Sequence, residues 1–133
     1  MREILLGKIK KSLRAEKNVL FAYVYGSFGR GEADFSDIDI AVFLSKIPKN
    51  SAPYEAKLGQ KLEKETGKPV EVRIMNSMPL LLKSRVFREG KTVFSRNKKA
   101  RVSFETALMS SYLDFSHLMQ EFDQRRLERY GIG

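Results

Sequence analysis

The chain has 133 residues, 42% of them hydrophobic and 31% charged, as expected for one globular domain spanning residues 1–133. With no cysteine and one histidine, it cannot form disulfides, use a thiol nucleophile or build a metal site from several histidines. No apolar run has the length of a membrane span, and the N-terminal residues lack a signal-peptide core, so we expect a cytoplasmic protein with no membrane partner. Without cysteine and with a single histidine, any metal site must use carboxylates.

Positive charge is concentrated in two segments of a chain whose net charge is +9. Residues 1–17 contain six basic and two acidic side chains, and residues 83–101 contain eight and one. This pattern favours a phosphate-bearing ligand or an acidic partner protein, with an ordinary solvated surface as the alternative. Nucleic acid is not expected as a specific partner, because the second segment has only two aromatic residues and no helix-turn-helix pattern is present.

The first third of the chain predicts a helix, a strand and a glycine-rich turn. Residues 2–17 place apolar side chains at helical spacing between charges, which predicts an amphipathic helix. Residues 20–25 form an apolar run that predicts a buried strand. Residues 26–36 contain three glycines and predict a loop with a short helix.

The remaining segments alternate between strand and helix patterns. We expect strands at 38–44, 70–75 and 92–94, and helices at 54–66 and from Pro79 to Glu89. From about residue 102 to 129 one long helical pattern runs without proline or glycine. The elements together predict an α+β fold, in which helices back one small mixed sheet and a long helix ends the chain.

The stretch from Gly26 to Asp39 reads GSFGRGEADFSDID and begins with a candidate phosphate-binding turn. Gly26 lets the backbone approach a ligand closely, because it has no Cβ. Ser27 is expected at a strand-to-helix turn, where its hydroxyl and the free backbone N–H groups form an anion site. Arg30 is placed to contact a phosphate or to brace the loop. The alternative is a simple helix cap in a glycine-rich turn.

Asp37 and Asp39 are candidate metal ligands at the start of the second predicted strand. Residues two apart in a strand face the same way and lie roughly 6.5 to 7 Å apart, so both carboxylates can converge on one site. Mg²⁺ prefers oxygen ligands and accepts phosphate oxygens alongside carboxylates. The pair therefore predicts a magnesium and triphosphate site, with a solvated pair of strand-edge acids as the alternative.

Glu71 is the third candidate acid, in the next predicted strand. It alternates with Val70 and Val72 and can face the same side as the aspartates. In that position it could bind the metal and act as the general base that takes a proton from an attacking hydroxyl. The alternative is a surface ion pair with Arg73.

These residues resemble the signature of the DNA polymerase β nucleotidyltransferase superfamily, in which a Gly-Ser turn precedes two aspartates separated by one residue. The residues that match the minimal nucleotidyltransferases (MNT) of that superfamily are Gly26, Ser27, Arg30, Gly31, Ser36, Asp37 and Asp39. The resemblance implies a polymerase-β-type nucleotidyltransferase fold, with Asp37 and Asp39 as magnesium ligands and Ser27 on the nucleotide phosphates. Glu71 matches the third catalytic carboxylate by strand order, where many relatives carry aspartate.

The resemblance covers nearly the whole chain, so no second, acceptor-binding domain is expected. The sequence is in this respect similar to MNT antitoxins encoded beside HEPN toxins, which transfer AMP from ATP to a tyrosine of the toxin. The partners implied are ATP and a HEPN-type toxin. The alternatives are an antitoxin that neutralises its toxin by binding alone and an RNA-directed nucleotidyltransferase.

The long C-terminal helical pattern carries an apolar stripe with spacings of three and four residues. The stripe consists of Leu108, Met109, Tyr112, Phe115, Leu118, Met119 and Phe122. It can pack on the protein's own sheet, or its outer part can dock a partner helix or a second copy of the chain. A homo-oligomer through this helix is therefore one expectation.

Overall fold

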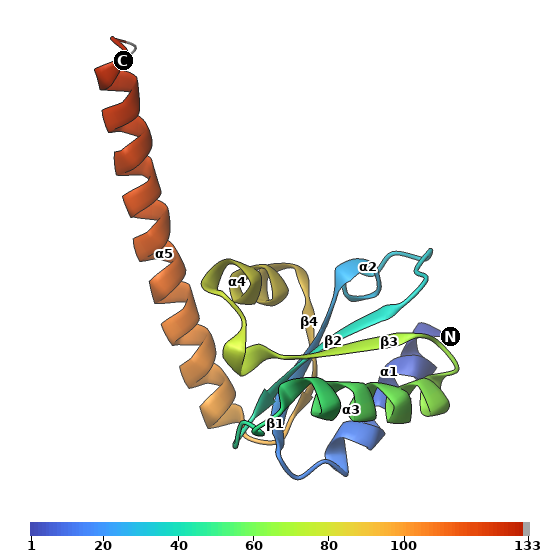
Figure 1. Ribbon diagram of the computed structural model, residues 1–133. Helices are drawn as coiled ribbons and strands as arrows, with labels where there is room; N and C mark the ends of the chain where they lie inside the picture. Colours follow the sequence, from blue (N-terminus) through green and yellow to red (C-terminus); the bar gives the residue numbers. More distant parts are fainter. Residues whose placement is uncertain (132–133) are drawn as a thin grey trace.

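A computed structural model describes residues 1–131 as a four-stranded mixed sheet with helices on both faces (Figure 1). This arrangement confirms the predicted α+β class and the long C-terminal helix. The elements in chain order are α1 (Arg2–Arg14), β1 (Val19–Tyr25), α2 (Gly26–Gly29), β2 (Ile38–Leu44), α3 (Ser51–Thr66), β3 (Val70–Ile74), the 3-10 helix η1 (Met75–Ser77), α4 (Leu80–Glu89), β4 (Lys91–Ser95) and α5 (Lys98–Arg129).

The strands lie in the order β3-β2-β1-β4. β1 is antiparallel to both of its neighbours, and β2 is parallel to β3. Consequently the end of β1 and the starts of β2 and β3 meet at one edge of the sheet. This edge is where the sequence places the glycine-rich turn and the candidate acids.

Each face of the sheet has its own hydrophobic cluster. On one face α1 and α3 bury Ile9 and Leu62 against strand residues such as Ile40. On the other face α4 and the start of α5 pack Val86 and Phe104 against the strands. The alternation along β2 and β3 assigns every second side chain to the first cluster, which turns the remaining side chains toward the second face.

The structure corrects the starts of two predicted helices. α5 begins at Lys98 instead of residue 102, because the side chain of Asn97 caps it by accepting a hydrogen bond from the Ala100 N–H at 2.9 Å. α3 begins at Ser51 instead of residue 54, since Pro53 lies in the first turn, where the missing N–H costs no helical hydrogen bond. The predicted strand 70–75 ends one residue early, at Ile74.

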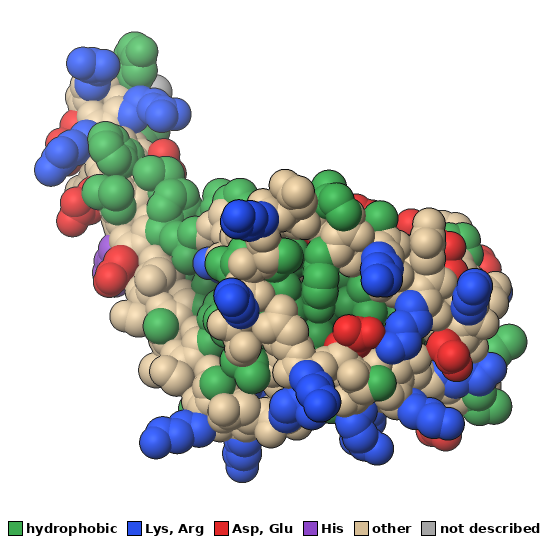
Figure 2. Space-filling view, turned by 60° about the horizontal axis from the view of Figure 1, so that its bottom comes forward, with side chains coloured by type: hydrophobic (Ala, Val, Ile, Leu, Met, Phe, Trp, Pro, Cys, Tyr) green, Lys and Arg blue, Asp and Glu red, His purple; other side chains and the backbone are tan. Residues whose placement is uncertain are grey.

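Only the first part of α5 packs on the domain, and the rest projects away from it (Figures 1 and 2). The buried hydroxyl of Tyr23 bonds to Glu105, which also pairs with Arg101 at 3.0 Å, and Leu108 is buried. Met109 and Phe122 are 51% and 50% exposed. Packing on the sheet therefore accounts for Leu108, and in part for Tyr112 and Phe115, but not for the rest of the predicted stripe.

No helix within residues 1–131 has both the length and the apolar character that a membrane crossing requires. Part of the basic segment 83–101 serves the fold itself. Arg96 donates hydrogen bonds to the carbonyl oxygens of Val19 at 3.1 Å and Arg14 at 2.7 Å, and so ties the end of β4 to the α1–β1 connection.

Candidate active site

Gly26 joins β1 directly to α2, and its backbone lies against the Asp39 carboxylate. Its φ is +67°, which favours glycine, and a Cβ added there would overlap Oδ2 of Asp39. Both the turn and the neighbouring carboxylate therefore require a residue without a side chain. The backbone at Gly26 therefore lies close to Asp39, and its close approach to a ligand stays a prediction.

Replacing Gly26 by alanine is expected to reduce both stability and activity. The left-handed backbone should cost about 1–2 kcal/mol of unfolding free energy, and the new methyl group should push the Asp39 carboxylate out of position. Gly67→Ala is the matched control, because Gly67 has φ +71° and nothing within 4 Å of its added Cβ. Denaturant unfolding should show a similar loss in both variants, whereas nucleotidyl transfer should fall only in Gly26→Ala. Equal activity in the two variants would contradict the role of Gly26.

α2 presents an uncapped N-terminus at the edge of the sheet. Its N-cap is Tyr25, and no side chain makes a capping hydrogen bond to its first turn. Ser27, half-buried, is the second residue of this turn. Backbone N–H groups without a capping side chain are free to bind an anion, and the phosphate site stays a prediction.

Arg30 follows α2 and connects it to neighbouring segments. Its Nε lies 2.6 Å from a Glu32 carboxylate oxygen, and its Nη1 lies 3.7 Å from Glu89 at the end of α4. Of the two sequence-based interpretations, the structure therefore shows Arg30 bracing the turn. Its contact with a nucleotide phosphate stays a prediction.

The three candidate carboxylates gather at the edge of the sheet next to α2. Asp39 is paired in register with Tyr25 of β1 on one side and with Glu71 of β3 on the other. Asp37 lies two residues earlier, immediately before β2. Both aspartates are half-buried and Glu71 is exposed. The aspartate pair and the acid on the next strand therefore lie where the strand pattern predicted them.

Electrostatic repulsion among these acids affects the pKa of Asp39. Burial raises the pKa of Asp39, the nearby Asp37 and Glu71 carboxylates raise it further, and Arg30 opposes them. A cation bound among the carboxylates would relieve this repulsion. Oxygen donors of this kind fit Mg²⁺.

The acids do not by themselves form a closed metal cage. Across residues 1–131, no group of three or more aspartate, glutamate, histidine or cysteine side chains is arranged to hold a metal ion. The donor set therefore fits an ion that also uses water and phosphate oxygens, as Mg²⁺ commonly does. Binding of Mg²⁺ by Asp37, Asp39 and Glu71 stays a prediction.

Glu71 makes no ion pair with Arg73 in the described part of the chain, so that interpretation of Glu71 is not supported. The positive charge of Arg73 instead lies near Tyr25, a residue that is not among the predicted site residues. Burial and the Asp39 charge raise the pKa of Tyr25 to about 12, against the opposing effect of Arg73. No local signal in the sequence indicates this role, because Tyr25 meets Asp39 only through the antiparallel register of β1 and β2.

Solved structures with the same fold include a tri-AMPylated Shewanella oneidensis HEPN toxin in complex with MNT antitoxin. The matched chain has 24% identity and a TM-score of 0.72, with 96% of this chain and 99% of that chain covered. A toxin-antitoxin structure with AMP-PNP has 25% identity and a TM-score of 0.73, with 92% and 98% covered. The toxin-antitoxin MntA-HepT has 23% identity and a TM-score of 0.70, with 94% and 98% covered.

No curated protein matches the chain. The family model described as polymerase beta, nucleotidyltransferase matches residues 7–99, which contain the glycine turn, both aspartates and Glu71. The chain belongs to the polymerase beta nucleotidyltransferase family.

Proposed function

We propose that the protein is a Mg²⁺-dependent adenylyltransferase that moves AMP from ATP to a tyrosine of a HEPN-type toxin and thereby acts as an antitoxin. The observation that carries the proposal is the backbone of Gly26 lying against Asp39, with Asp37 and Glu71 beside it. Contact inhibition alone needs none of these features. The structural neighbours support the proposal, since one is a tri-AMPylated HEPN toxin bound to MNT antitoxin and another contains AMP-PNP.

In the proposed reaction the residues of this chain divide into three roles. The N–H groups at the start of α2 and the Ser27 hydroxyl hold the triphosphate. Asp37 and Asp39 hold Mg²⁺, which would supply charge stabilisation at the phosphates when bound. Glu71 takes the proton of the tyrosine hydroxyl. The tyrosine oxygen forms a bond to the α-phosphorus of ATP, the bond from that phosphorus to the bridging oxygen breaks, and pyrophosphate leaves.

The proposal is tested with ATP labelled at the α-phosphate, Mg²⁺ and the product of the neighbouring gene as the candidate toxin. We expect label on the toxin, located to a tyrosine by mass spectrometry, and none when Mg²⁺ is removed by a chelator. ATP should be preferred over the other triphosphates. Label on RNA instead of protein would favour an RNA-directed enzyme, and equal use of all four triphosphates would contradict the expected preference.

Neutralisation by contact alone is the second candidate, and the projecting half of α5 favours it. Leu118 and Phe122 are 49% and 50% exposed there, which leaves apolar surface for a partner. A toxin that is inhibited in full without ATP, and that carries no label afterwards, would support this alternative over the enzyme.

A further inference from the structure

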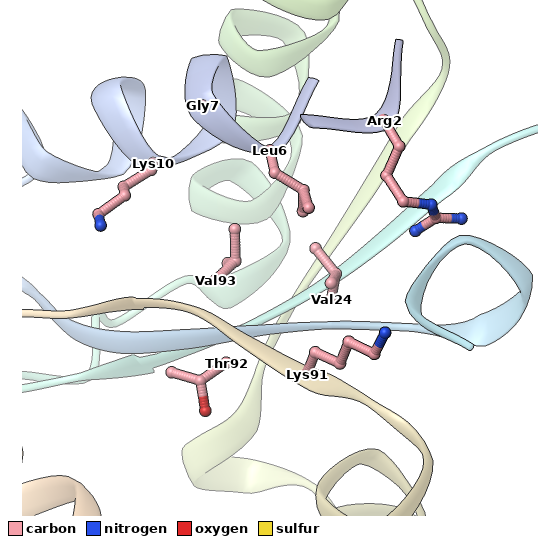
Figure 3. A pocket seen from close by; sticks show the side chains of 8 residues that line it. All are labelled: Arg2, Leu6, Gly7, Lys10, Val24, Lys91, Thr92 and Val93. Atoms are coloured by element: carbon pink, nitrogen blue, oxygen red, sulfur yellow. The ribbon is translucent and has the colours of Figure 1, made fainter. Parts of the chain in front are cut away.

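A cavity of about 230 Å³ lies between α1 and the edge strand β4. Figure 3 shows Leu6, Val24 and Val93 in its middle. Val24 belongs to the cluster on the α1 and α3 face of the sheet, whereas the acids lie beside Tyr25, which packs on the opposite face. The cavity is therefore separate from the candidate active site.

Positive charge surrounds the apolar centre of this cavity. Lys10 stands at one end, and Arg2 and Lys91 stand at the other (Figure 3). None of the described residues that line the cavity is acidic, and neither lysine forms an ion pair within residues 1–131. Unpaired cations around apolar walls are complementary to a ligand that carries both an anionic group and an apolar body.

Gly7 lines the cavity and is exposed. It lies in the middle of α1, where glycine costs about 1 kcal/mol of helix stability relative to alanine. At a packed glycine such as Gly29 an added Cβ would meet neighbouring atoms, here the Val24 carbonyl oxygen at 2.5 Å. At Gly7 it would meet nothing within 4 Å. Packing therefore does not require this glycine, and the space beside it is open to a larger side chain.

The cavity also touches the back of the glycine turn. The Arg2 guanidinium donates hydrogen bonds to the carbonyl oxygens of Phe28 at 2.5 Å and Glu32 at 3.0 Å, on either side of the end of α2. The Lys91 ammonium lies 4.0 Å from the position of a Cβ on Gly31. A ligand that binds these two cations would be coupled to the turn that begins the candidate active site.

We propose that this cavity binds a small organic anion, with its apolar body against Leu6 and Val93 and its carboxylate or phosphate group at Arg2 and Lys91. The volume is below the roughly 300 to 1,000 Å³ of pockets for drug-sized ligands, so the ligand is a short acyl or aryl compound. Binding on this face does not depend on the proposed function of the chain.

Titration calorimetry of the full chain with octanoate and with octyl phosphate tests the site, and octanol and inorganic phosphate serve as controls. At least one of the two anions should bind, at least about tenfold more tightly than octanol, and higher salt should weaken it. Whichever anion binds more tightly identifies the preferred head group. If neither binds, or if octanol binds equally well, the proposal is wrong.

Variants on α1 and β4 locate the binding. Gly7→Leu should abolish it, because the new side chain fills the open space, and leucine strengthens the helix so that the variant folds. Lys91→Gln should weaken it at least about tenfold, whereas Lys8→Gln, at an exposed position outside the cavity, should leave it unchanged. Unchanged binding by Gly7→Leu would assign the anion to another surface and overturn the proposal.

Discussion

Asp37→Asn and Asp39→Asn should each abolish nucleotidyl transfer while the protein stays folded. Each change removes one negative charge from the predicted Mg²⁺ site with almost no change in volume. Metal stabilisation of the transition state amounts to several kcal/mol, and about 1.4 kcal/mol corresponds to a factor of ten in rate. We therefore expect transfer to slow by at least about a thousandfold, measured as label reaching the acceptor in single-turnover reactions.

Asp39→Asn should not lower the stability of the fold, although it should abolish transfer. Burial and two neighbouring carboxylates raise its pKa, so the folded protein holds this proton more tightly than the unfolded chain does. Stability is then lost as the pH rises through the ordinary pKa of aspartate toward the raised value, and the ionised group opposes folding at pH 7. Asn carries no such charge, so Asp39→Asn should unfold at a temperature equal to or above that of the wild type when Mg²⁺ is absent.

Asp34→Asn is the matched control, because Asp34 is an exposed acid in the same segment between α2 and β2. It should keep both the transfer rate and the melting temperature of the wild type. Adding Mg²⁺ should raise the melting temperature of the wild type and of Asp34→Asn, but not of Asp39→Asn. Transfer at the wild-type rate by the variant that carries both Asp37→Asn and Asp39→Asn would show that these residues do not hold the metal.

Much of the candidate site could be predicted because it depends on local patterns. The alternation along β2 from Ile38 to Leu44 determines which face of the sheet each side chain takes, and so it places Asp39 on the face opposite Ile38 and Ile40. The same period in β3 places Glu71 and Arg73 together. Short-range spacing sufficed for both strands, and their bounds were predicted to within one residue.

Features that depend on contacts between distant segments were not predictable in the same way. The overlap between a Cβ at Gly26 and Asp39 requires the antiparallel register of β1 and β2, which no local pattern specifies. The bonds from Arg2 to the end of α2 span 26 and 30 residues of sequence. The start of α5 at Lys98 differs in kind, because its signal is local: the Asn97 side chain caps the helix.

Glu71→Gln should separate nucleotide binding from chemistry. Glutamine keeps the size of the side chain and the place of residue 71 in β3. In the proposed site, Asp37, Asp39 and the α2 turn would still bind Mg²⁺ and ATP. Loss of a positioned general base typically slows a reaction about 10²- to 10⁴-fold. We therefore expect ATP affinity close to that of the wild type, measured by titration, and transfer at least about a hundredfold slower in a single turnover.

Two further variants make this expectation specific to Glu71. Glu65→Gln makes the same chemical change at an exposed position of α3 and should leave transfer unchanged. Glu71→Asp keeps the carboxylate but withdraws it by one methylene, so it should bind ATP normally and recover part of the rate lost in Glu71→Gln. If Glu71 had only a structural role, Glu71→Gln and Glu71→Asp would transfer at the wild-type rate, like Glu65→Gln. Only the unfolding free energy would change, by about 0 to 1 kcal/mol as for a surface residue. Because Arg73 is not ion-paired to Glu71 in the structure, even that small loss is not expected, and an unchanged rate in Glu71→Gln would mean that another group accepts the proton.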